Sequence, residues 1–258
     1  MKLNKKSFCC LHLKILVVIL FVIISQVTYA QTLKFGVFEI EPWGQLSKGE
    51  ITGINWEQGQ AILNTTNLSA VPAISNYPRM IKQLTEGKTD CAIFTVSPAI
   101  ADNFHQIAYL YDLTVVAISR KGIDINSTKD LKDENKIKTI GFANGTDIAF
   151  QELFYDPEIS THIIPSPAHA PLLLAKKRID AFIGIKRTMS YAVNKANAKS
   201  FIAYPWYEIK KLAVWLQCSK KSSLTKIEIN ELRKKAIALR DRGQLDKIIN
   251  KWILDDTN

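Results

Sequence analysis

Gly145 and Thr146 form a candidate anion-binding turn, because they stand between a predicted strand and a predicted helix. Free backbone N–H groups at a helix start can hold an anionic oxygen, and the Thr146 hydroxyl would add a further donor. The same residues also fit ordinary helix capping by Asn144 or Thr146. The pattern alone leaves both interpretations open.

Hydroxyl and aromatic side chains follow several predicted strands. Thr95 and Ser97 come after an apolar strand and could offer hydroxyls and carbonyls to a ligand, or could belong to an internally bonded loop. Aromatic residues near strand ends could form the walls of a pocket, although such residues often belong to a core, so we expect about half of them to contact ligand. These aromatic candidates are Phe38, Trp43, Tyr77 and Phe94.

Charged residues give a second group of candidates. Glu39, Glu41 and Glu57 could attract a cationic group, whereas Lys186 and Arg187 could hold an anion. All five also fit solvated surface, which we expect for at least three of them. The residues predicted to bind ligand are therefore Phe38, Glu41, Trp43, Tyr77, Phe94, Thr95, Ser97, Gly145, Thr146 and Lys186.

Neither metal nor cofactor chemistry is indicated. His105, His162 and His169 lack cysteine or carboxylate partners at ligand spacing, so no metal site is expected. No paired nucleophile and base stands out, and no catalytic residue is predicted. The sequence thus predicts a binding protein without a cofactor, not an enzyme.

The N-terminus has the layout of a secretory signal peptide over residues 1–30. Four lysines precede an apolar run, Ile15–Ile24, and small residues at Thr28 and Ala30 offer a cleavage site. The run is shorter than the ~20 apolar residues that span a bilayer, although an uncleaved anchor is the alternative. Cys9 and Cys10 precede the run, so a lipid-anchored cysteine is not expected. Cleavage after Ala30 would place the protein in the periplasm.

Cys91 and Cys218 remain after this leader. An exported protein can form a disulfide, but sequence separation does not establish contact, and Cys91 could be a small buried hydrophobe. Removing the leader lowers the formal net charge from +10 to +6, because it holds four lysines and no acidic residue. The basic residues near the C-terminus lack a nucleic-acid-binding module, so no nucleic-acid partner is expected.

Strands and helices alternate along the chain. The hydrophobic pattern predicts strands at 33–38, 71–74, 91–96, 114–119, 138–142, 179–185 and 212–217. It predicts helices at 56–63, around Met80–Leu84 with Gly87 as the stop, and at 146–155, 171–177, 188–196 and from Ser223 with a break at Gly243. Thr225 and Glu228 could form a capping box within the start of the last of these. Two βαβ-like blocks, before and after about residue 115, favour an α/β fold with largely parallel sheets in two packed lobes.

Six segments follow one another in a characteristic order. The most specific is Tyr77–Asp90, in which a helix, a glycine and an aspartate lead into a strand. The others are Glu41–Trp43 with Gly49 and Ile51–Glu57, Tyr109–Tyr111 leading to Arg120–Gly122, Asp130–Leu131 with Ile140–Gly141 and Gly145–Thr146, Leu174–Ile185, and Gly243–Ile248 with Lys251–Trp252. In this order the chain resembles the bacterial extracellular solute-binding proteins of family three, which include polar amino-acid receptors.

The resemblance implies a two-lobed, type II periplasmic-binding-protein-like fold in which the chain crosses between lobes twice. Lobe 1 would hold residues 31–115 and 211–258, and lobe 2 residues 116–210. A ligand would lie in the cleft between them and be enclosed by hinge motion. A monomer that delivers a small-molecule ligand to a membrane permease or membrane sensor is expected.

Three positions depart from the family's amino-acid receptors. The resemblance implies an arginine for the ligand carboxylate about five residues after Ser97, where this chain has Asp102. Ile185 stands where it implies an aspartate for the ligand ammonium, and Phe38 replaces an acidic residue of the first strand. The sequence therefore predicts a small polar metabolite other than a standard α-amino acid.

Three functions compete. The first is a receptor for ABC-type uptake, and the second is a sensing module for a membrane signalling protein. The third is an enzyme on the same scaffold, such as a dehydratase of the cyclohexadienyl type, with Glu39 or Glu41 as general acid. The receptor is the function that we expect.

Overall fold

The fold is that of a computed structural model, which describes residues 31–95, 98–146 and 156–254. Four sequence predictions lie outside these residues: the signal peptide 1–30, Ser97, the end of the third strand at Val96, and most of the helix 146–155. The elements of residues 32–258 belong to one compact unit. Within its described part, no helix combines the length and hydropathy that a membrane crossing requires.

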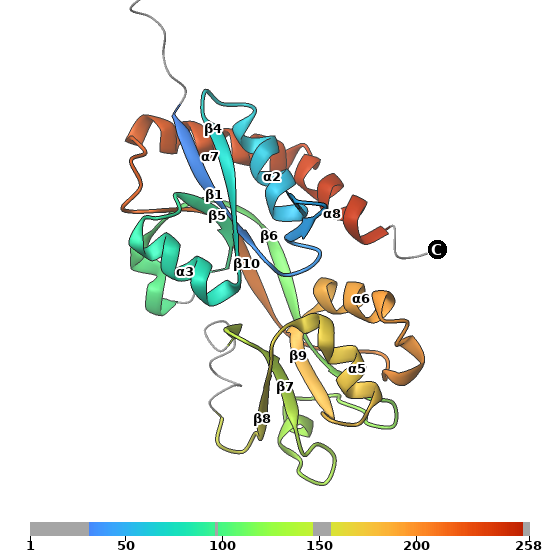
Figure 1. Cartoon of the computed structure of the whole chain (residues 1–258). Helices are drawn as coiled ribbons and strands as arrows, with labels where there is room; N and C mark the ends of the chain where they lie inside the picture. The colour runs from blue at the N-terminus through green and yellow to red at the C-terminus, as the bar shows by residue number, and fades with distance from the viewer. Residues whose placement is uncertain (1–30, 96–97, 147–155, 255–258) are drawn as a thin grey trace, which may run out of the picture. The chain divides into compact units, whose positions relative to one another are not determined.

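One eight-stranded mixed sheet runs through the molecule, in the order β4-β1-β5-β10-β6-β9-β7-β8 (Figure 1). Parallel strands form both of its ends: β4 (Ser69–Ser75), β1 (Thr32–Phe38) and β5 (Cys91–Phe94) at one, and β9 (Ala181–Ile185), β7 (Ile140–Ala143) and β8 (Thr161–Ile164) at the other. Between them lie the long antiparallel strands β6 (Phe104–Ser119) and β10 (Tyr207–Ser219). The predicted α/β class is confirmed.

Six helices and a small hairpin complete the main elements of the described residues. A hairpin of β2 (Gln45–Ser47) and β3 (Glu50–Thr52) precedes α2. Short 3₁₀ turns lie at Pro98–Asn103, Asp130–Lys132, Pro167–His169 and Lys199–Phe201. The helices are α2 (Ile54–Leu63), α3 (Tyr77–Glu86), α5 (Ala170–Ala175), α6 (Lys186–Lys195), α7 (Lys226–Asp241) and α8 (Gln244–Leu254).

Local capping chemistry sets several helix ends as predicted. The Asn76 side chain accepts a hydrogen bond from the Arg79 N–H at the start of α3, and Gly87 ends the helix with a left-handed φ of 76°. At α7, Thr225 and Glu228 form the predicted capping box. The Gly87 stop and the capping box depend on residues close in sequence, which is why the sequence located them, whereas the Asn76 cap was not predicted.

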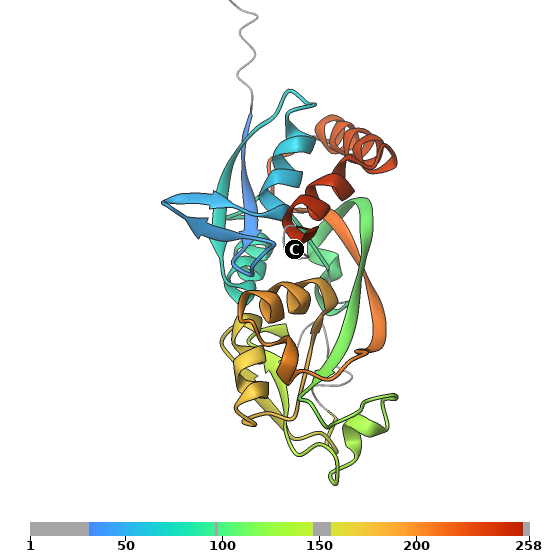
Figure 2. The same ribbon diagram turned by 90° about the vertical axis from the view of Figure 1, so that its right-hand side faces the viewer.

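Two groups of buried side chains define two lobes. In lobe 1, β1, β5, α2, α3, α7 and α8 surround core residues such as Phe35 and Leu232. In lobe 2, β7, β8, β9, α5 and α6 surround residues such as Phe142 and Leu174. β6 and β10 contribute to both cores and run side by side from one lobe to the other (Figure 2). The exact domain boundaries predicted from the sequence stay a prediction.

The strand predictions were incomplete. β6 begins at Phe104 and β10 at Tyr207, well before the predicted strands at 114 and 212, and β2, β3 and β8 were not predicted. β6 and β10 stabilise each other over a ladder that reaches from the pair Phe104–Ser219 to the pair Ala117–Tyr207. This pairing joins segments about a hundred residues apart. It therefore extends both strands into stretches whose own hydrophobic pattern does not predict a strand.

Each lobe contains the same helix–turn–aspartate–strand unit. In lobe 1, Asp90 precedes β5 and its Oδ2 accepts the Lys34 N–H of β1 at 2.8 Å. In lobe 2, Asp180 precedes β9, and its Oδ2 accepts the N–H groups of Lys138 (2.9 Å) and Thr139 (3.2 Å) just before β7. Each aspartate therefore links the start of the strand that follows it to the backbone at the start of the neighbouring parallel strand.

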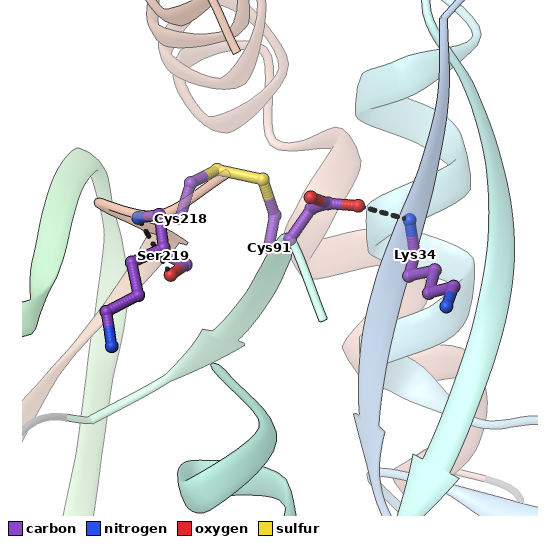
Figure 3. The surroundings of a disulfide bond; sticks show 6 residues. Lys34, Cys91, Cys218 and Ser219 are labelled. Carbon is purple, nitrogen blue, oxygen red and sulfur yellow. Dashed lines mark hydrogen bonds between the residues drawn. A yellow bond between two sulfur atoms is a disulfide. The ribbon is translucent and has the colours of Figure 1, made fainter. Parts of the chain in front are cut away.

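Cys91 and Cys218 form a disulfide (Figure 3). The two residues are direct partners in the β5–β10 ladder, with Cα atoms 3.9 Å apart, and both are buried. The structure thus decides the question that the sequence left open. The bond closes a loop with a sequence separation of 127 residues, which contains all of lobe 2.

Candidate functional site

A cavity of about 120 Å³ lies between the lobes. Lobe 1 lines it with the carboxyl ends of β1 and β5, the loop that follows β1, and the first turns of α2 and α3. Lobe 2 contributes the ends of β7 and β9 and the first turn of α6, and β6 and β10 form its floor with Tyr111, Leu113, Leu212 and Val214. The site therefore lies where strand ends of both lobes converge.

Aromatic rings form the lobe 1 wall. β1 and β5 are parallel neighbours, so Phe38 and Phe94 at their carboxyl ends come together, with ring centroids 5.7 Å apart. Tyr77, the first residue of α3, adds a third ring 5.1 Å from Phe38. Each of these residues lines the cavity, as does Phe182 of β9 on the lobe 2 side.

Trp43 links the two lobes. Its indole Nε1 donates a 2.8 Å hydrogen bond to the Thr188 hydroxyl in the first turn of α6, and both side chains are buried. Its ring stacks on Tyr111, with centroids 6.3 Å apart. Because Trp43 and Thr188 both line the cavity, the bond closes one side of it.

The polar groups among the described lining residues are uncharged, and several of them bond to backbone carbonyls. The Thr146 hydroxyl donates to the Ala143 carbonyl at 2.7 Å, and Asn55 Nδ2 donates to the Ile93 carbonyl at 3.3 Å. The Thr95 carbonyl accepts a long, 3.5 Å contact from the Tyr77 hydroxyl. None of the cavity's described lining residues is acidic or basic. The helix-start anion site at Gly145–Thr146 stays a prediction, because residues 147–155 lie outside the described part of the chain.

The charged candidates lie elsewhere, in ion pairs. Glu41 pairs with Lys195 across the cleft, in a wider neighbouring cavity of about 540 Å³, and this hydrogen bond raises the pKa of Lys195. Lys186 pairs with Glu208 at 2.6 Å, with both side chains half exposed. Glu57 accepts from Lys251 (3.1 Å) and from the Trp252 indole (3.0 Å).

Gly145 lies beside the cavity and does not line it. It has a left-handed φ of 80°, and a Cβ built on it would lie 2.5 Å from Pro78 Cγ of α3. Glycine therefore allows the lobes to approach at this point. The predicted site residues that line the cavity are Phe38, Trp43, Tyr77, Phe94, Thr95 and Thr146. Their role in ligand binding remains a prediction.

Several lining residues were not predicted. Asn55 is a buried polar residue on the inner face of α2. A polar residue at a position where the helix pattern predicts burial is a signal that could have identified it as a site residue. Tyr111 belongs to a segment that the resemblance had already selected. Phe182 and Thr188 gave no local signal, because β9 is buried along nearly its whole length and α6 buries an ordinary apolar stripe.

Two of the three departures from amino-acid receptors fall in the cavity. Phe38 and Ile185 line it, whereas Asp102 is exposed. Arg187 lies near Tyr111. Burial raises the pKa of the Tyr111 hydroxyl, and the positive charge of Arg187 acts in the opposite direction. Its Nη1 is buried without a hydrogen-bond partner in the described part of the chain. Arg187 does not line the cavity.

Comparisons with known proteins show likeness in structure but not in sequence. No family model matches the chain, and no curated protein matches it. A histidine kinase sensor domain with similarity to periplasmic binding proteins superposes with a TM-score of 0.72 at 16% identity, over 87% of this chain and 96% of that one. The AvGluR1 ligand-binding domain in complex with phenylalanine superposes with a TM-score of 0.73 at 21% identity, and the match covers 87% of this chain and 96% of that one.

An ancestral arginine-binding protein bound to arginine is a third similar structure. Its TM-score is 0.69 at 18% identity, and the match covers 86% of this chain and 97% of that one. At such low identities the superpositions support the fold alone. This fold agrees with the resemblance to family-three solute-binding proteins. The chain therefore has the two-lobed periplasmic-binding-protein-like fold.

Proposed function

We propose that the protein is a periplasmic solute-binding protein, which holds a small metabolite other than a standard α-amino acid between its lobes for ABC-type uptake. The observation that carries the proposal is the cavity itself. It lies between two lobes joined by β6 and β10, has aromatic walls, and contains no charged side chain among its described lining residues. Concave, largely apolar sites with a few placed polar groups are typical of small-molecule binding.

The uncharged lining argues against a zwitterion. An α-amino acid brings a carboxylate and an ammonium, and a buried charge without a partner is strongly unfavourable. Phe38 and Ile185 place a ring and an aliphatic chain in the lining, and neither can form an ion pair with the ligand. The similar structures include AvGluR1 complexes with phenylalanine and with glutamate, both α-amino acids, so only the described lining of this chain, which holds no charged residue, disfavours such a ligand here.

A sensing role is the second candidate, supported by the likeness to a histidine kinase sensor domain. The same cavity would then report ligand to a membrane signalling protein. Loss of uptake of the identified ligand in a deletion strain supports transport. Unchanged uptake together with a lost transcriptional response supports sensing.

An enzymatic role has weaker support. Glu41, a candidate general acid, is paired with Lys195 and lies outside the lining of the aromatic cavity. We therefore propose binding without turnover. Conversion of a prephenate-like substrate that is lost in Glu41→Gln would contradict this.

The decisive experiment is mass spectrometry of small molecules released from the purified protein, followed by calorimetry with the compound found. Thr95→Trp places an indole in the cavity wall and should abolish binding. Thr161→Trp is the control, because Thr161 is exposed on the edge strand β8. If nothing is released and a broad metabolite panel gives no thermal shift, the proposal is wrong.

Export is tested separately. Cell fractionation should find a chain that starts at Gln31 in the periplasm, as cleavage after Ala30 requires. A full-length chain retained in the membrane fraction would instead support an uncleaved anchor.

A further inference from the structure

We infer that the cavity selects an electrically neutral molecule with one aromatic ring and a hydrogen-bond donor, such as a primary aryl amide. This inference rests on the proposed function, because it assigns a ligand class to the same cavity. Size is the first argument. The volume of about 120 Å³ is close to the ~150 Å³ of a dry protein cavity known to bind benzene.

The walls suit a flat ring. Phe38, Tyr77 and Phe94 form a cluster with neighbouring centroids 5.1 and 5.7 Å apart, and Phe182 faces the cavity from lobe 2. Separations of this kind are typical of offset and edge-to-face packing between aromatic rings. A ligand ring can therefore extend an aromatic cluster that already exists.

Charge is the second argument. Two of the predicted charged residues, Glu41 and Lys186, are engaged outside the cavity lining in pairs with Lys195 and Glu208. An ionic ligand would leave its water shell for a lining that offers no opposite charge among the described residues. Arg187, which lies near Tyr111, has a buried Nη1 without a hydrogen-bond partner among the described residues, so the test must ask whether this cation neutralises an anion.

The polar groups favour a ligand that donates. The Thr146 hydroxyl donates its hydrogen bond to the Ala143 carbonyl, so the lone pairs of its oxygen can accept a hydrogen bond from a ligand. The Thr95 carbonyl is likewise an acceptor, which the Tyr77 hydroxyl contacts only at 3.5 Å. An amide N–H₂ group matches such acceptors without bringing a formal charge.

Benzamide, benzoate and benzamidinium provide the test, because they have nearly the same shape and differ in charge. Calorimetry with the purified protein, freed of any bound molecule, should show benzamide binding at least about tenfold more tightly than either ion. Thr95→Trp should abolish this binding, whereas Thr161→Trp should keep it.

A charge placed in the wall should shift the preference toward the cation. Ile185→Asp adds a carboxylate to the lining, and Ile185 is the N-cap of α6 without a capping side chain, a position that suits aspartate. We expect this variant to bind benzamidinium at least about tenfold more tightly relative to benzamide than the wild type does. The control is Ile227→Asp, which makes the same change where the side chain is 81% exposed and should leave the preference unchanged.

The outcomes separate the ligand class from the proposed function. Tightest binding of benzoate, lost in Arg187→Gln, would overturn the inference and leave the receptor function standing. Failure of all three probes to bind, while another metabolite is released from the purified protein, would do the same. If the probes fail and no metabolite is released or bound, both the inference and the proposed function are wrong.

Discussion

Single residues decide how closely the lobes approach beside the cavity. Gly145 combines a φ of 80° with a position against Pro78 of the opposite lobe. Trp43 reaches Thr188 on the other side, and the pair is buried. At these two points the fit between lobes depends on one missing Cβ and on one hydrogen bond.

Gly145→Ala should weaken ligand binding about tenfold and lower stability by about 1 kcal/mol. The loss of stability comes from a left-handed backbone, and the loss of affinity from the new Cβ, which would meet Pro78 Cγ at 2.5 Å. Gly122→Ala is the matched control, because Gly122 has a φ of 91° but nothing within 4 Å of its added Cβ. Calorimetry and thermal unfolding of both variants measure the two effects. Equal affinities in the two variants would show that the Pro78 contact does not limit closure.

Among elements, the aspartate-led strands β5 and β9 are the clearest repeated units. Lobe 2 offers the sharper test because Asp180 also accepts from Arg120 Nε at 2.9 Å. Burial acts to raise the pKa of Asp180, but the N–H groups of Lys138 and Thr139 and the Arg120 guanidinium outweigh it and hold the pKa below its ordinary value. The ionised carboxylate therefore stabilises the folded lobe.

Asp180→Asn should lower the free energy of unfolding at neutral pH by about 1–3 kcal/mol. Because the folded pKa is depressed, the contribution of Asp180 is present above about pH 4 and is lost as the pH falls through the folded value. The gap between variant and wild type should therefore shrink in acid, as measured by urea unfolding from pH 7 to pH 3. Asp124→Asn, a change at an exposed aspartate of the same lobe, should have little effect. A gap that is constant with pH would contradict the assignment.

At the scale of the whole molecule, β6 and β10 are the covalent route between the lobes, and the disulfide fixes the lobe 1 end of β10. Cys91 and Cys218 close a loop that contains all of lobe 2, with a separation of 127 residues. The bond restricts the unfolded chain more than it adds packing to the folded one, since both residues already belong to the β5–β10 ladder.

Replacing both cysteines by alanine should lower the free energy of unfolding by about 2–5 kcal/mol without changing the fold. Urea unfolding with and without dithiothreitol should show a reductant effect in the wild type and none in Cys91→Ala/Cys218→Ala. Peptide mapping after alkylation gives an independent check. Alkylation of Cys91 and Cys218 in unreduced, unfolded protein would show that the disulfide does not form.

The sequence by itself determined the α/β alternation, the buried face and glycine stop of α3, the capping box of α7, and the aromatic strand ends Phe38 and Phe94. These features depend on side-chain period and on contacts between residues close in the chain. The tertiary structure decided the partner of Cys91, the ion pair of Glu41, and the convergence of uncharged residues, Phe182 and Thr188 among them, in the described lining of the cavity. All of these depend on which distant strands become neighbours, and on the placement of β10 between β5 and β6, which no local pattern contains.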